Sequence, residues 1–271
     1  MYLESWEVCK TRFTKMHGLG NDYLYIYGEL PAPGEVSRKL SDRHFGVGSD
    51  GIILITPSQV ADFKMRIFNA DGSEANMCGN GIRCVGKYVF DKGYTEKTHL
   101  TIETLSGIRV LDLKISHGKV TYATVNMGKA EVRTPVVLSV DGVEVACTPV
   151  SVGNPHAVIF VPDAQHAPLA TVGAALERHE FFPDGVNVEF AQVIDRRTLR
   201  MRVWERGSGI TMACGTGACA SAAAAVTAGY CDKNEEITVR LDGGDLQIKV
   251  LTNSTVLMTG PATVCECEVD M

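Results

Sequence analysis

The feature that most constrains this chain is a short unit that occurs twice. Each copy begins with a cysteine, continues through a glycine-containing turn and a predicted helix, and ends at a Gly-Tyr pair. The cysteines open the motifs Cys78-Gly79-Asn80-Gly81 and Cys214-Gly215-Thr216-Gly217. When these motifs are aligned, the apolar stretches before them also align, residues 64–69 with residues 200–205. Several matches in the same order indicate a duplicated domain, so we predict two related halves with one such cysteine each.

Most of the remaining local signals are those of β-strands. Short alternating or apolar runs bounded by turn residues predict strands in both halves. They span residues 13–17, 23–27, 52–55, 63–68, 100–104, 109–116, 120–126, 136–140, 143–145, 157–161, 186–190, 199–204, 237–241, 246–251, 255–259 and 263–269. The chain is therefore expected to be mainly sheet.

Helices are predicted at a few places only. They span residues 35–45, where Gly46 is placed to cap the helix, residues 80–92, residues 169–179 and the alanine-rich stretch after Cys214. The small side chains of that last stretch indicate a buried helix. The expected fold class is α/β (α+β) with two pseudo-symmetric domains. We place the N-terminal domain at 1–125, with 262–271 returning to it, and the C-terminal domain at 126–261.

Composition limits the classes of partner. The chain has 271 residues, of which 45% are hydrophobic and 21% charged, and a net charge of −6. This charge argues against binding to nucleic acid or to an anionic membrane. No apolar run approaches the roughly 20 residues of a transmembrane helix. Residues 1–10 contain Glu4 and Glu7 and lack a continuous apolar segment, so we predict no signal peptide and a cytoplasmic protein.

The cysteine content also favours a reducing compartment. Nine cysteines are an odd number, and a chain of this length does not need disulfides for stability. Without a Cys-x-x-Cys pair, a zinc site is weakly supported, and we predict no metal. Free cysteines commonly behave as small buried hydrophobes, and this is expected of four of them: Cys84, Cys147, Cys219 and Cys231.

A cysteine immediately before a helix is placed for chemistry. The unpaired N–H groups and the positive end of the helix dipole favour a thiolate and can bring its pKa from ~8.5 toward neutrality. The same N–H groups bind carboxylates. If both helix ends face one substrate, one thiolate can remove an α-proton while the other thiol delivers a proton to the opposite face, which inverts the stereocentre. This scheme requires no pyridoxal cofactor.

Simpler interpretations remain open for these motifs. Both cysteines could be buried thiols at helix starts, or the protein could be a non-catalytic dithiol protein that acts in redox chemistry or binds metal. A dinucleotide-binding pattern at Gly46-x-Gly48-x-x-Gly51 is discounted because it follows a predicted helix and precedes a strand, the reverse of the required order.

A set of longer blocks occurs in one order along the chain. The blocks are 15–22, 68–74, 78–84, 153–156, 185–187, 204–207 and 213–218. Together they resemble the motif set of the diaminopimelate epimerase family. The resemblance implies two pseudo-symmetric domains, each a mixed β-structure wrapped around a central helix, with the active site in the cleft between them. It implies interconversion of LL- and meso-2,6-diaminopimelate, in lysine and peptidoglycan precursor synthesis, without cofactor or metal and in a homodimer.

The resemblance also implies roles for individual residues. Cys78 and Cys214 would be the acid/base pair; by analogy Cys78 donates and Cys214 accepts the proton, with roles that exchange with direction. Contacts to the reacting carboxylate would come from the backbone of Gly79, Asn80, Gly215 and Thr216. The rest of the substrate would be held by Asn21, Asn69, Asn154, Asn187, Glu205 and Arg206. His156 and Glu205 would tune the site.

These assignments agree with side-chain chemistry. Asparagine offers both donors and acceptors, and Arg206 can hold a carboxylate through two parallel hydrogen bonds. An asparagine in a turn can instead serve its own backbone, which applies to Asn21, Asn69 and Asn154. One departure from the family concerns Gly51, which stands where some members carry a glutamine that reaches the substrate. Residues 1–10 also extend beyond the family's start.

The strongest alternative enzyme is a proline or hydroxyproline racemase of the same fold. The two-thiol chemistry would be unchanged. A secondary ring amine, however, would not require Arg206 and several asparagines, so this alternative is the less favoured.

Overall fold

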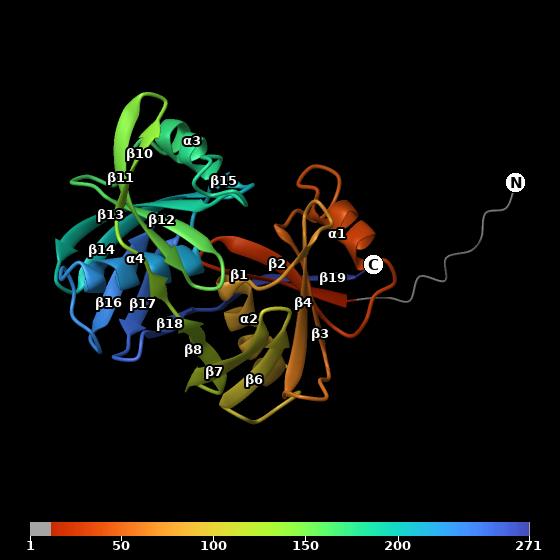
Figure 1. Ribbon diagram of the computed structural model, residues 1–271. Helices are drawn as coiled ribbons and strands as arrows, with labels where there is room; N and C mark the ends of the chain where they lie inside the picture. Colours follow the sequence, from red (N-terminus) through yellow and green to blue (C-terminus); the bar gives the residue numbers. More distant parts are fainter. Residues whose placement is uncertain (1–11, 271) are drawn as a thin grey trace, which may run out of the picture.

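The computed structural model describes residues 12–270, with side chains over 12–265, so the extension at residues 1–10 lies outside the described residues. Two halves, each with a central helix, lie side by side (Figure 1). The first half contains β1 (Arg12–Gly18), β2 (Asn21–Tyr27), α1 (Pro33–Ser41), β3 (Gly51–Thr56), β4 (Phe63–Asn69), β5 (Glu74–Ala75), α2 (Gly79–Asp91), β6 (His99–Thr104), β7 (Gly107–Ser116) and β8 (Lys119–Lys129).

The second half repeats much of this order. It contains β9 (Glu131–Val132), β10 (Val136–Val140), β11 (Val143–Ser151), β12 (Pro155–Phe160), a π-helical turn (Leu169–Gly173), α3 (Ala174–Glu177), β13 (Asn187–Asp195), β14 (Thr198–Glu205), β15 (Gly209–Ile210), α4 (Gly215–Thr227), β16 (Glu236–Leu241), β17 (Gly244–Val250) and β18 (Thr255–Pro261). A last strand, β19 (Thr263–Asp270), follows.

Strand pairing shows the duplication directly. In the first half β2 is parallel to β3, β3 antiparallel to β4, and β4 parallel to β6, which begins an antiparallel series to β8. In the second half β12, β13, β14, β16, β17 and β18 follow the same sequence of directions. The predicted fold class, two pseudo-symmetric α/β halves, is confirmed.

Two pairings tie the halves together. Strands β8 and β18 run antiparallel, with Val125 opposite Met258. The chain then returns to the first half, where β19 pairs with β1 and Val269 lies opposite Phe13. Each half is therefore completed by strands from distant parts of the sequence.

The helices α2 and α4 are the centres of the two halves. Strands surround both helices (Figure 1), and both are buried along most of their length. In α4 the alanines Ala218, Ala220 and Ala222–Ala225 are at most 2% exposed, because small side chains let the surrounding strands approach closely. In α2, Ile82, Val85 and Val89 fill the core instead. Truncating such a residue to alanine typically costs about 2–5 kcal/mol of stability.

Two predicted helices differ from the structure. The first ends at Ser41 and not at Phe45, because Asp42 Oδ1 accepts hydrogen bonds from the backbone N–H groups of His44 and Phe45 and turns the chain. The predicted cap at Gly46 is therefore wrong. The helix predicted over 169–179 is a π-helical turn followed by one short α-helical segment.

Candidate active site

Cys78 is the N-cap residue of α2. Its extended backbone leads into the helix, and Sγ accepts a hydrogen bond from the Gly81 N–H at 3.3 Å. The thiol donates to Asn21 Oδ1 at 3.2 Å, so the turn between β1 and β2 reaches this cysteine. The side chain is only partly buried. Cys78 thus lies where a helix end meets a polar loop.

Cys214 occupies the same position at α4. Its Sγ accepts from the Gly217 N–H at 3.4 Å and lies 3.6 Å from Thr216 Oγ1. This residue is 4% exposed. The repetition seen in the sequence therefore extends to the hydrogen bond that each sulfur receives from its own helix.

The N-termini of the two helices meet. Asn80 Nδ2 in α2 donates to the carbonyl of Ala213, directly before Cys214, at 3.3 Å. Met258 lies against both ends, since a Cβ at Gly79 or at Gly215 would come within 3.0 Å of its side chain. Two positive helix ends side by side form a site for an anion. Asn80 Oδ1 is buried there without a hydrogen-bond partner among residues 12–265.

The second half carries a buried polar chain behind Cys214. His156 Nδ1 lies 2.7 Å from Glu189 Oε1, and His156 Nε2 lies 3.1 Å from Asn154 Oδ1. Asn154 Nδ2 donates to Thr216 Oγ1 at 3.3 Å, which connects the chain to the cysteine motif. His156 and Glu189 are 0% exposed. Glu189 and Asn154 together fix the orientation of the His156 ring.

Burial and charge set the thiol pKa values. Burial raises the pKa of Cys78, and the charge of Glu205 adds to this, while the Gly81 N–H acts against it. Burial also raises the pKa of Cys214 well above its usual value, and Glu205 and Glu189 raise it further. The prediction that the helix ends bring these pKa values toward neutrality is therefore wrong here, because desolvation and the carboxylates outweigh the helix ends.

Glu205 ends β14 next to the cysteines. Its carboxylate accepts from Thr211 Oγ1, and burial raises its pKa while Thr211 and Cys214 lower it. It contributes electrostatically at both thiols. A ligand charge that offsets the charge of Glu205 would therefore change the pKa of both thiols.

Three other predicted binding residues contact groups in nearby turns and strands. Asn69 Nδ2 donates to Ser73 Oγ at 3.1 Å within its own turn. Asn187 donates to the carbonyl of Pro155 at 3.1 Å and accepts from the Arg206 N–H at 3.0 Å. The exposed guanidinium of Arg206 donates to the carbonyl of Asp184 at 2.7 Å. Within residues 12–265, none of these three side chains makes a hydrogen bond to either cysteine.

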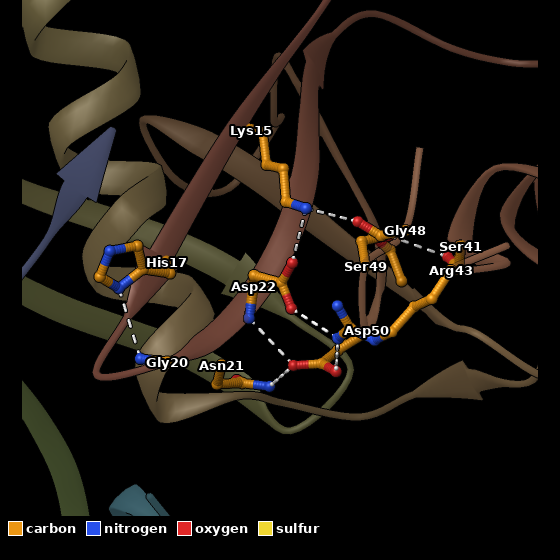
Figure 2. Close-up of polar contacts among 11 residues, drawn as sticks. Lys15, His17, Gly20, Asn21, Asp22, Ser41, Arg43, Gly48, Ser49 and Asp50 are labelled. Carbon is orange, nitrogen blue, oxygen red and sulfur yellow. Dashed lines mark hydrogen bonds and ion pairs between the residues drawn. The ribbon is translucent and has the colours of Figure 1, made fainter. Parts of the chain in front are cut away.

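Sequence reasoning missed two acidic residues. Glu189 lies in the buried first part of β13, between Val188 and Phe190, and a carboxylate flanked by apolar residues was the available signal. Asp50 accepts from Asn21 Nδ2 at 2.7 Å, as Figure 2 shows. It follows the Gly-x-Gly turn that had been discounted as a nucleotide motif.

Four of the other thiols are buried, as predicted. Cys84, Cys147, Cys219 and Cys231 are at most 3% exposed. Within the described part of the chain, no group of three or more His, Cys, Asp or Glu residues is arranged to hold a metal ion. A cavity of about 1020 Å³ lies near the other end of α2, among residues such as Lys87, Tyr88 and Lys119, and none of the predicted site residues lines it.

Comparison with known proteins identifies the family. A sequence profile described as diaminopimelate epimerase matches residues 13–133 and 148–265. This chain belongs to the diaminopimelate epimerase family. It is 52% identical to the diaminopimelate epimerase of Acetivibrio thermocellus, over 96% of this chain and 99% of the relative. It is 48% identical to the enzyme of the same name from Bacillus subtilis, over 94% and 97% of the two chains. The resemblance inferred from the motifs is confirmed.

Solved structures show how widely the fold is used. A hydroxyproline epimerase from Agrobacterium vitis matches with a TM-score of 0.75 at 17% identity, over 98% of this chain and 94% of that one. A phenazine biosynthesis protein of the PhzF family from Bacillus anthracis matches with a TM-score of 0.71 at 18% identity, over 97% and 99%. At such identities the similarity concerns the fold alone. No helix within residues 12–270 is long and apolar enough to span a membrane.

Proposed function

We propose that this chain interconverts LL- and meso-2,6-diaminopimelate through a pair of cysteines. One observation carries the proposal. Each cysteine caps its own helix, and the N-termini of the two helices converge on Asn80 and Met258. The substrate is inferred from the family, since the chain is 52% and 48% identical to two members named diaminopimelate epimerase.

The reaction needs only proton transfers. The substrate's α-carboxylate accepts hydrogen bonds from N–H groups at the two helix ends. Cys214, as thiolate, takes the α-proton, so the C–H bond breaks and its electron pair moves into the carboxylate as an enediolate. The thiol of Cys78 then protonates the opposite face, which leaves the inverted product, a thiol at Cys214 and a thiolate at Cys78. The enediolate is stabilised by the same preorganised N–H groups.

The protonation states change when substrate binds. Both thiols have raised pKa values in the free enzyme, and Glu205 contributes at each. The α-ammonium of the substrate brings a positive charge to this carboxylate, which removes part of the penalty on a thiolate. We therefore propose that Glu205 tunes the site, and we assign the same role to His156 on the family resemblance.

The distal end of diaminopimelate is a second amino acid. We assign its recognition to Asn69, Asn154, Asn187 and Arg206, with Asn21 near the reacting end. Arg206 is exposed and can exchange its contact with the Asp184 carbonyl for a substrate carboxylate. We also propose a homodimer in the cytoplasm.

Hydrogen exchange at the α-carbon tests the proposal. Purified, reduced protein is incubated with LL-diaminopimelate in D2O without added cofactor, and α-deuterium is followed by NMR together with formation of the meso form. We expect deuterium at the inverted centre. L-Proline and trans-4-hydroxy-L-proline serve as control substrates and should remain unlabelled. Absence of exchange with diaminopimelate under reducing conditions would refute the proposed function.

A further inference from the structure

An aspartate outside the predicted site is connected to Cys78 through one side chain. Asp50 Oδ2 accepts a hydrogen bond from Asn21 Nδ2 at 2.7 Å. The oxygen of the same amide, Asn21 Oδ1, accepts from the Cys78 thiol at 3.2 Å. Figure 2 shows the Asn21 amide nitrogen directed at the Asp50 carboxylate. One amide thus separates the carboxylate from the thiol.

The carboxylate determines which way this amide faces. An ionised carboxylate only accepts hydrogen bonds, so the amide group directed at Asp50 must be the NH2 group. The amide oxygen is then left facing Cys78. An oxygen acceptor stabilises the thiol, which can donate a hydrogen, and disfavours the thiolate. The opposite orientation would present an N–H donor and favour the thiolate.

Asp50 itself is held firmly. Its Oδ2 also accepts from the Asp22 N–H at 2.9 Å, and its Oδ1 accepts from Arg43 Nη2 at 2.9 Å. Arg43 bridges to Asp22, which in turn pairs with Lys15 at 3.0 Å (Figure 2). The backbone N–H of Asp50 donates to the carbonyl of Asp22 at 2.7 Å. The carboxylate therefore cannot easily turn away from Asn21.

We propose that Asp50 is a positioning residue that holds the Asn21 amide oxygen toward Cys78 and so keeps this cysteine in the thiol form until substrate binds. The inference rests on the proposed function, in which Cys78 is the proton donor. It assigns that role before the substrate arrives, through a side chain that does not touch the reacting carbon.

The second half has no such device. Aligning Asn21 with Asn154 places Leu24 at the position of Ala157. Their partners on the next strand, Ile52 and Val188, then correspond as well, so Val186 occupies the position of Asp50. The amide that corresponds to Asn21 belongs to Asn154, and it faces His156 and Thr216. An amide that is oriented by a carboxylate and accepts a hydrogen bond from the thiol is therefore found in the first half only.

Other charges also act on Cys78 and must be separated from this effect. Glu205 raises its pKa from the second half, and Arg83 of α2 lowers it. The buried Tyr23 lies against the thiol from β2. Around Asp50 itself the charged groups are Asp22, Arg43 and Lys15. Removing the charge of Asp50 would lower the pKa of Cys78 by simple electrostatics as well, so the experiment must test whether the effect passes through Asn21.

A double-mutant cycle makes this separation. In a Cys214→Ser background, alkylation of Cys78 by iodoacetamide is measured against pH by peptide mass spectrometry. Asp50→Ser should lower the pH midpoint by about one unit, the size expected when an acceptor at a thiol is replaced by a donor. In an Asn21→Ala background, Asp50→Ser should shift the midpoint by less than about 0.3 units, the electrostatic part alone, because the amide through which the larger effect acts is gone.

Controls keep the result interpretable. Asp22→Asn removes a charge from the same cluster while leaving the Asn21–Asp50 hydrogen bond, and should move the midpoint by less than about 0.3 units. If Asp50→Ser does not fold, as judged by circular dichroism, Asp50→Asn is measured instead and should give a smaller shift in the same direction. An unchanged or raised midpoint, or an equal shift without Asn21, would overturn the proposal. Alkylation requires no turnover, so this result is independent of whether the enzyme epimerises diaminopimelate.

Discussion

The two cysteine neighbourhoods have the same backbone and different side chains. Strand register places Tyr23 where the second half has His156, and Ile53 where it has Glu189. Ile53 lies against Gly81 in the first half, and Glu189 lies against Gly217 in the second. The duplicated part is thus the backbone of strand, turn and helix, which we call the frame. The side chains that pack against each helix start, Ile53 and Glu189, form the inner walls of the two halves. These walls have diverged, so a buried carboxylate lies behind only one of the two thiols.

This difference explains why two similar thiols are not equivalent. Burial raises the pKa of both, but Cys214 also faces Glu189 in addition to Glu205, and its pKa is raised well above the usual value. At Cys78, Glu205 acts without Glu189, and the thiol donates a hydrogen bond to the neutral Asn21 amide. Charge therefore contributes at both thiols, and a cationic ligand can offset it. At Cys78 a ligand must in addition displace the hydrogen bond to Asn21.

The strongest test of the pairing is to replace each cysteine separately. Cys78→Ser and Cys214→Ser should each reduce epimerisation by about 10²–10⁴-fold, because a hydroxyl replaces one member of an acid/base pair. Rates are measured by NMR with LL- and with meso-diaminopimelate. A variant that keeps most of its activity in both directions would show that only one thiol is required, which would contradict the proposal that the two cysteines act as a pair.

Glu189→Gln should reduce the difference between the two thiols. Glu189 raises the pKa of Cys214, so loss of its charge should let this thiol deprotonate at a lower pH, by about one unit. The pH midpoint of Cys214 alkylation is the measurement, and that of Cys78 in the same sample is an internal reference. Glu236→Gln, at an exposed position on β16, should leave both midpoints in place. A Cys214 midpoint that stays fixed would mean that burial alone sets its pKa.

A matched pair of glycine substitutions tests the inner walls with a smaller effect. An alanine Cβ at Gly217 would lie 2.7 Å from Glu189 Oε1, and one at Gly81 would lie 2.8 Å from Ile53 Cδ1. Glu189 is fixed by His156, whereas the end of an isoleucine can shift. We expect Gly217→Ala to lower the free energy of unfolding by about 2–3 kcal/mol and Gly81→Ala by about 1 kcal/mol. Urea denaturation of both variants measures the difference, and equal losses would argue that the walls are equally rigid.

The repeated backbone of strand, turn and helix could be predicted from the sequence, whereas the side chains that surround the two thiols could not. The repeated Cys-Gly-x-Gly motif predicted that both cysteines begin helices, and α2 and α4 begin directly after them. The first predicted helix extended too far because the effect of Asp42 on the following backbone was not recognised. The raised thiol pKa values were missed because a motif indicates a helix end and does not reveal how deeply it is buried. Asp50 and Glu189 were missed because their partners are far away in sequence.

The return of β19 to β1 also affects how the protein is made. Phe13 pairs with Val269, so one edge of β1 remains unpaired until a strand that is synthesised much later has left the ribosome. Pairings this distant in sequence form slowly, and an unpaired strand edge invites association with other chains. A chain that stops at Ala262, directly before β19, should therefore aggregate during refolding at concentrations where the full chain stays monodisperse by light scattering. Strand β19 contains none of the proposed site residues, yet its pairing with β1 would determine whether the first half associates with other chains.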